Sequence, residues 1–328
     1  MWIIFITNKD HTKLHPYYIL LVVSISCLFL LLDGSIPDIY GDTNFHRTNN
    51  SKCNCVVFRM DDIQDYWLNS VQSAVMDLFL SKGQNLSLGL ITHAVGNDSK
   101  IVDKIEAGLN KRLFELDVHG WDHVNYSKLS QNEQKVSLYN ASSKIEKIFG
   151  IKPDVFIPPS DSFDNNTIWA MKDLRIKILS SGLPEERRLD QNKNIFSIPN
   201  HEGPNNSKIV ISKSSEENKK KIIEDKDSAN SIVYDLPATV LFKDFKNGKW
   251  VKTQFVDIIG NVTKNISEHG YAVVVLHPQD FAHTSNGTSR YINSIDKRDI
   301  SDLANLIDYL VSRNVMIVPF SKVIPFSQ

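Results

Sequence analysis

Two adjacent carboxylates, Asp61 and Asp62, closely follow the apolar run at residues 56–58. Consecutive side chains of a strand point in different directions, so one carboxylate can bind a metal ion while the other faces a bound water molecule. Further along the chain, His119 and His123 form a His-x-x-x-His pair. This spacing places both imidazoles on one side of a helical turn, as in other metal-binding pairs.

Each of these features alone has a commoner structural explanation. Adjacent acidic residues usually lie in solvated loops, and most His-x-x-x-His matches are pairs of polar loop histidines. Their combination favours a metal site, because two imidazoles and one carboxylate leave open positions for water and substrate. The sequence therefore predicts one divalent metal ion, with zinc expected.

The elements that must position these residues alternate between two kinds. Short apolar runs, several of them rich in β-branched residues, predict strands at residues 55–60, 86–91, 114–118, 155–157, 176–180, 195–198, 209–211, 231–236, 271–276 and 315–318. Amphipathic stretches predict helices at residues 67–79, at 130–149 after a capping box, at 258–266 and at 302–312. Alternation of this kind implies parallel strands joined by right-handed crossovers, so the predicted class is α/β.

Polar clusters lie at the carboxyl ends of the predicted strands. In an α/β barrel these ends share one face, which is where the active site is built. The clusters are at residues 59–62, 119–123, 158–161, 235–237 and 277–280. We therefore expect them to converge on one mouth.

The motifs resemble those of the polysaccharide deacetylases, carbohydrate esterase family four. In that family a strand ends in two aspartates, the first a general base and the second a metal ligand, and a His-x-x-x-His ligand pair follows. A Pro-rich motif and a late Leu-His motif, whose histidine is the general acid, come after. The matching residues are Asp61, Asp62, His119, His123, Pro158, Pro159, Leu276 and His277.

The resemblance covers roughly residues 55–323 and implies an irregular (β/α) barrel of seven or eight strands. It implies a metal ion on Asp62, His119 and His123 that activates water and polarises an acetamide carbonyl. Asp61 is then the catalytic base, and His277 is the catalytic acid that protonates the departing amine. The implied reaction releases acetate from an N-acetylated glycan.

Three positions depart from the family pattern. Ile157 occupies the place of the usual arginine of the Pro-rich motif, Ser160 replaces an aromatic residue, and Ile63 replaces a glycine. We predict that Arg59 takes over from the missing arginine, because side chains two apart on a strand point the same way and Arg59 would then lie beside Asp61.

Further residues are expected to contact the substrate or to support the catalytic groups. A backbone N–H near Ser160 is expected to bind the oxyanion of the tetrahedral intermediate. Trp121 is as consistent with stacking on a sugar ring as with an ordinary rim position. The full set is Arg59, Trp121, Pro158, Pro159 and Ser160.

Two other functions fit the sequence. A glycan-binding protein on a catalytically weak or inactive deacetylase fold would account for the missing arginine. A hydrolase of a non-sugar amide would keep the metal chemistry and change the substrate.

The N-terminal part of the chain predicts a membrane anchor. Residues 17–32 are an uncharged, mostly apolar run, preceded by Lys9 and Lys13. We expect a cytoplasmic segment at 1–16, a transmembrane signal anchor at 17–32, a linker at 33–54 and an extracellular catalytic domain at 55–328. Cleavage of the run as a signal peptide is the alternative and would make the protein secreted.

The net charge and composition restrict the classes of partner expected for the protein. A formal net charge of −1 and a pI near 6.8 give no electrostatic footprint for nucleic acid. Cys53 and Cys55 are expected to be buried free thiols of one strand. An outward-facing domain agrees with the Asn-x-Ser/Thr sequons at Asn49, Asn85, Asn97, Asn125, Asn140, Asn165, Asn205, Asn261, Asn265 and Asn286. No oligomeric state follows from these features.

Overall fold

The computed structural model describes residues 53–182, 211–213, 233–246, 249–285 and 290–324. The predicted anchor at 17–32, the segment before it, nearly all of the linker and the candidate strand at 195–198 lie outside these residues. Within the described ranges, no helix is both long and apolar enough to cross a membrane.

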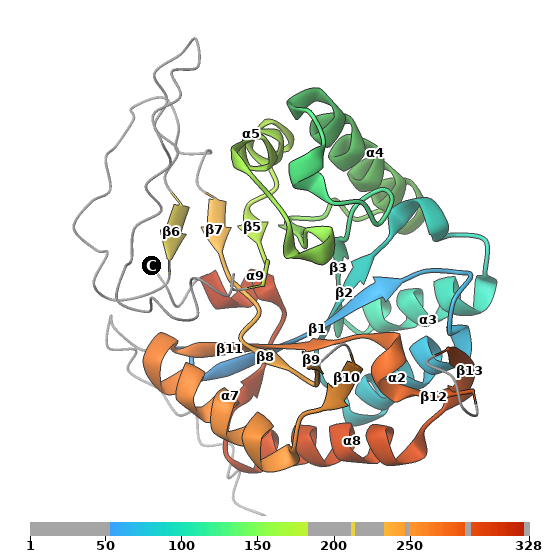
Figure 1. Ribbon diagram of the computed structural model, residues 1–328, viewed down its shortest axis with the longest axis vertical. Helices are drawn as coiled ribbons and strands as arrows, with labels where there is room; N and C mark the ends of the chain where they lie inside the picture. The colour runs from blue at the N-terminus through green and yellow to red at the C-terminus, as the bar shows by residue number, and fades with distance from the viewer. Residues whose placement is uncertain (1–52, 183–210, 214–232, 247–248, 286–289, 325–328) are drawn as a thin grey trace, which may run out of the picture. The chain divides into compact units, whose positions relative to one another are not determined.

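A curled parallel sheet forms the centre of the domain (Figure 1). Its strands are β1 (Cys55–Ile63), β2 (Leu86–Leu90), β3 (Phe114–Val118), β4 (Val155–Phe156), β5 (Ile178–Leu179), β6 (Ile211–Lys213), β7 (Val233–Asp235), β8 (Val240–Leu241), β11 (Tyr271–Leu276) and β14 (Met316–Ile317). The order is β6-β7-β5-β4-β3-β2-β1-β11-β8, with β14 paired to β1. The predicted α/β class is confirmed. Within the described residues the sheet has ten strands, where seven or eight were expected, and the strand order has two ends, at β6 and β8.

Helices follow most of the strands and cover the outer side of the sheet. They are α2 (Asn69–Lys82), α3 (Ser99–Asn110), α4 (Gln131–Phe149), α5 (Asn165–Leu174), α7 (Phe255–His269) and α8 (Lys297–Ser312). The short α9 (Phe320–Val323) packs instead against the opposite face of the sheet. The predicted capping box of α4 is present, with Ser130 and Glu133 bonded to each other's backbone N–H. Helices α3 and α5 were not predicted from the sequence.

The alternation of β1 divides the core into two layers. Val56, Phe58 and Met60 belong to the large cluster that includes the buried faces of the helices. Val57 belongs to a smaller cluster formed by strand residues and α9. Arg59 continues this second phase, because residues two apart on a strand share a face. The concave side of the sheet is therefore apolar near the start of β1 and polar near its carboxyl end.

Two hairpins form small sheets separate from the central one. One is formed by β9 (Lys243–Lys246) and β10 (Lys249–Lys252), and the other by β12 (Ala282–Thr284) and β13 (Tyr291–Ile295); both are antiparallel. Lys252 connects the first hairpin to α8 through ion pairs with Asp299 and Asp302. The hairpins were not predicted, because their strands are short and carry few apolar residues.

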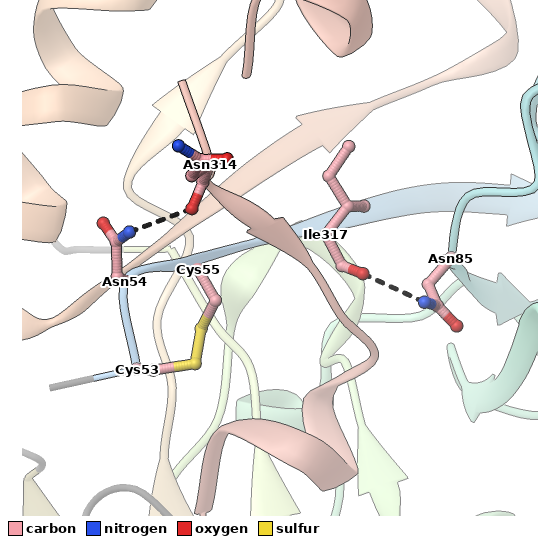
Figure 2. The surroundings of a disulfide bond; sticks show 6 residues. All are labelled: Cys53, Asn54, Cys55, Asn85, Asn314 and Ile317. Carbon is pink, nitrogen blue, oxygen red and sulfur yellow. Dashed lines mark hydrogen bonds between the residues drawn. A yellow bond between two sulfur atoms is a disulfide. The ribbon is translucent and has the colours of Figure 1, made fainter. Parts of the chain in front are cut away.

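The expectation of free thiols at Cys53 and Cys55 was wrong. The two cysteines form a disulfide, shown in Figure 2, with Cα atoms 5.2 Å apart. The expectation assumed an extended strand through both residues. Asn54 instead has a left-handed conformation with φ of 50°, and β1 begins only at Cys55. The side-chain amide of Asn54 donates to the carbonyl oxygen of Asn314 at 3.1 Å, which fixes this turn beside β14.

Candidate metal centre

Asp61 and Asp62 point in different directions because the end of β1 is irregular. Asp61 is 2% exposed on the concave side of the sheet. Asp62 has a φ of 62°, and the register of β1 against β2 shifts between Met60 and Ile63. A bulge of this kind re-aims a side chain. Here the Asp62 carboxylate lies toward the histidine pair.

Both predicted histidine ligands lie beside Asp62. The Nε2 atoms of His119 and His123 are 3.4 Å and 3.3 Å from Asp62 Oδ1. His119 Nδ1 is 2.9 Å from the carbonyl oxygen of Ile157. Since a carbonyl can only accept, Nδ1 carries the proton and Nε2 keeps its lone pair for a metal ion.

The three side chains fit a divalent metal ion. Their candidate ligand atoms all lie within 4.8 Å of one another. Tetrahedral zinc with bonds of about 2.0–2.1 Å places its ligand atoms about 3.3 Å apart. The separations from Asp62 Oδ1 match this spacing, and the set of one carboxylate oxygen and two imidazole nitrogens suits zinc.

Asp61 forms a buried ion pair with Arg59. Arg59 Nε lies 2.8 Å from Asp61 Oδ1, and an Nη atom lies 2.5 Å from Oδ2. Burial raises the pKa of Asp61, but the adjacent guanidinium outweighs burial and the pKa lies well below its usual range. Asp61 is therefore ionised at neutral pH.

Arg59 is held on every side. It donates to the carbonyl oxygen of Ser180 at 3.0 Å and lies 3.5 Å from the carboxylate of Asp161. Ser180 follows β5, and Asp161 ends the short helix η3 (Pro159–Asp161). Ile157 is buried on the same side of the sheet and cannot provide a cation. The guanidinium thus reaches Asp61 from β1, as predicted, and not from the Pro-rich segment.

His277 lies at the opposite wall of the site, after β11. The residue belongs to the turn before the short helix η5 (Pro278–Phe281), where the Asp280 carboxylate accepts from the His277 backbone N–H at 2.8 Å. Asp280 Oδ2 is also 3.7 Å from His277 Nδ1. Burial lowers the pKa of His277, but Asp280 and then Asp61 and Asp62 raise it to about 9. The imidazole therefore carries a proton at neutral pH.

One cavity of about 890 Å³ is lined by Arg59, Asp61, Asp62, His119, His123, Asp161 and His277. Pro158 and Ser160 line it as well, while Pro159 is buried against Gly120. From the metal centre the cavity continues past β8 to one flank of α7. The residues of that flank are Val256, Asp257, Gly260, Asn261, Lys264, Asn265 and Glu268.

Trp121 is not among the residues that line this cavity. Its ring lies 5.7 Å from the ring of His93, and Lys144 Nζ lies 5.6 Å above it. The backbone of His93 is bonded to the Trp121 carbonyl oxygen at 2.9 Å. The loop therefore turns Trp121 toward Lys144 of α4, and its stacking on a sugar ring stays a prediction.

Sequence reasoning missed a buried carboxyl beneath the site. Asp117 of β3 is fully buried, and neither of its oxygens has a hydrogen-bond partner among the described residues. Burial, then the charges of Glu115 and Asp61, hold the pKa of Asp117 well above its usual range. Burial therefore favours the protonated form of Asp117. The sequence did carry a signal for this position. Side chains alternate along β3, so Asp117 is expected on the same side as His119.

A polysaccharide deacetylase family model matches residues 48–179, which include Asp61, Asp62, His119 and His123. No curated protein sequence matches the chain.

Several solved structures resemble the domain. One is the Xyl-CE4 domain of a multidomain xylanase from the hindgut metagenome of Trinervitermes trinervoides, with 14% identity and a TM-score of 0.49 over 84% of this chain and 90% of that one. Another is a family 4 acetyl xylan esterase from Clostridium thermocellum in complex with a cobalt ion, with 13% identity and a TM-score of 0.49 over 82% and 89%. A third is a CE4 family pseudoenzyme from Bacillus anthracis, with 14% identity and a TM-score of 0.48 over 84% and 66%.

We predict that the domain binds one divalent metal ion. His119→Ala and His123→Ala should each remove most of it, because each deletes one of three ligands. Elemental analysis of the purified protein gives the stoichiometry, and His93→Ala, outside the ligand set, is the control. Unchanged metal content in both ligand variants would exclude this site.

Asp117→Asn should stabilise the domain at neutral pH. Below the unfolded-state pKa of about 4, both states are protonated and Asp117 adds no pH dependence. Above it, only the unfolded state gains by ionising, so the folded state loses stability until the pH passes the raised pKa of Asp117. The variant should melt a few degrees higher than the original protein at pH 7. The difference should shrink toward pH 4, and an equal or lower melting temperature at pH 7 would show that Asp117 is ionised or bonded in the fold.

Proposed function

We propose that this chain, whose residues 48–179 match the polysaccharide deacetylase family model, is a metal-dependent hydrolase of N-acetyl groups on a glycan. One observation carries the proposal. The candidate metal ligands Asp62, His119 and His123 share a cavity with an ionised carboxylate and a protonated imidazole. Amide hydrolysis needs both kinds of proton-transfer group.

Asp62, His119 and His123 would hold a divalent ion, which would supply water of lowered pKa and polarise the acetamide carbonyl. Asp61 accepts the proton that the attacking water loses. Its pairing with Arg59 keeps the carboxylate ionised and fixes the direction of both oxygens. Because the pair is buried, the carboxylate is held in place before substrate arrives.

His277 completes the reaction by donating a proton to the amide nitrogen as the C–N bond breaks. Asp280 holds the imidazole from the side of Nδ1 and keeps it protonated. The products are acetate and a free amine. The part of the cavity along α7 can admit a second sugar. A backbone N–H near Ser160, which lines the cavity, is the proposed donor to the oxyanion.

A glycan-binding protein without catalysis is the weaker proposal. It rested on the absence of an arginine at Ile157, since an unpaired base would protonate readily. Arg59 provides that guanidinium from another strand. A non-sugar amide as substrate is compatible with the same proton-transfer groups. Acetate release from N-acetylglucosamine oligomers distinguishes a glycan substrate from such an amide.

Acetate release from N-acetylglucosamine oligomers tests the proposal directly. Asp61→Asn should retain the metal ion and lose activity by about 10²–10⁴-fold, because it removes the base and keeps the ligands. Asp62→Asn should weaken metal binding itself. Full metal occupancy in Asp62→Asn together with loss of metal in Asp61→Asn would reverse the two assignments.

Arg59→Met should move the acidic limb of the pH–rate profile to higher pH. Arg59 lowers the pKa of Asp61, so its removal makes the base protonate more readily as the pH falls. Arg59→Lys, which keeps the charge without the paired hydrogen bonds, should shift the limb less. Circular dichroism and metal content verify that both variants are folded and loaded. A profile unchanged in Arg59→Met would show that another group sets the pKa of Asp61.

A further inference from the structure

Helix α7 forms one wall of the cavity, and the mechanism above does not use it. The helix packs beside β8 and β11, as Figure 1 shows. From the metal centre the cavity extends along the flank of α7 between Asp257 and Glu268. At about 1.5 Å per residue this flank is about 16 Å long, which exceeds the length of one hexose ring.

A glycine lies within this flank. Gly260 is an exposed interior residue of α7 and lines the cavity. A Cβ atom at Gly260 would meet no described atom within 4 Å, so packing among these residues does not require a glycine. Glycine inside a helix is destabilising relative to alanine, because it loses more conformational freedom on folding. The position therefore costs stability without a packing reason in the described part of the chain.

Gly108 of α3, the other glycine inside a described helix, does have a packing reason. A Cβ atom at Gly108 would begin 1.9 Å from the ring of Phe114. At Gly260 the space that a side chain would fill belongs to the cavity instead. A glycine in such a place lets a ligand approach the helix backbone closely.

The side chains around Gly260 suit a sugar ring. Asn261 and Lys264 are exposed and line the cavity, so an amide and an ammonium group can form hydrogen bonds with hydroxyls. Val256, which is 73% exposed, adds an apolar contact at the start of the same flank. A wall with apolar surface and a few polar groups is typical of small-molecule sites, and a pyranose offers both C–H and O–H groups to it.

We propose that the α7 flank around Gly260 is a subsite for the sugar units next to the one that is deacetylated, so that the substrate is a polymer and not a free monosaccharide. The inference rests on the proposed deacetylase function. A ring packed on the backbone at Gly260 has its hydroxyls beside Asn261 and Lys264. Because the subsite and the metal centre share one cavity, one glycan chain can occupy both.

Gly260→Gln tests the subsite, because glutamine favours the helix and fills the space above the backbone. In zinc-loaded protein from a bacterial host, kcat/KM for the N-acetylglucosamine tetramer should fall by about tenfold or more. The value for the methyl glycoside of N-acetylglucosamine, which occupies the metal centre alone, should stay unchanged. The original protein should prefer the tetramer to the methyl glycoside.

Thr263→Gln is the matched control. Thr263 is an exposed residue of α7 that is not among the residues lining the cavity, so the same side chain there should change neither value. Three results would overturn the inference: no loss for the tetramer in Gly260→Gln, an equal loss for the methyl glycoside, or a loss of the same size in Thr263→Gln.

Thermal stability provides a second readout. Gly260→Ala should melt about 2–4 °C above the original protein, because alanine suits a helix interior better than glycine. A lower melting temperature would show that the fold requires this glycine, and the reason to assign it to a ligand would be lost.

Calorimetric binding of the N-acetylglucosamine tetramer separates this inference from the proposed function. If the original protein releases no acetate from any substrate, the proposed hydrolysis fails. Tetramer binding that weakens about tenfold or more in Gly260→Gln, but not in Thr263→Gln, would then still support the subsite. Tetramer binding that is the same in the original protein and in Gly260→Gln, or absent from both, would overturn it.

Discussion

A guanidinium on the concave side of a parallel sheet must be paired on all sides, and the rest of the site depends on how Arg59 meets this requirement. A buried cation that lost its partners would destabilise the fold strongly. Arg59 draws its partners from β1, from the end of β5 and from η3. The same contacts that compensate one charge therefore fix the relative positions of three strand ends around the metal ligands.

Close packing around this ion pair explains two glycines. A side chain at Gly89 of β2 would begin 3.1 Å from an Asp61 carboxylate oxygen, and one at Gly182 would begin 2.3 Å from Asp161. Both acids contact Arg59. Each glycine therefore leaves room for one carboxylate of the pair network. The sequence shows them only as isolated glycines after or within strands, without the partners that make them necessary.

The sequence predicted the parts of the site that follow from alternation along a single strand or from a motif of fixed spacing. Arg59 beside Asp61 is of the first kind, and the His119 and His123 pair is of the second. Residues whose environment is made by distant segments were missed or misjudged. Trp121 lies against Lys144 of α4, and the burial of Asp117 depends on the elements that pack around β3.

Two asparagines on the wall of the cavity along α7 are also potential N-glycosylation sites. Asn261 and Asn265 line the cavity, and each begins an Asn-x-Ser/Thr sequon. They lie four residues apart and so emerge on the same side of the helix. An oligosaccharyltransferase that modified either residue would attach a branched sugar inside the cleft that the proposed substrate must enter. The choice of expression host thereby decides whether the purified protein has an open cleft, and peptide mass mapping of these two sequons shows which form has been made.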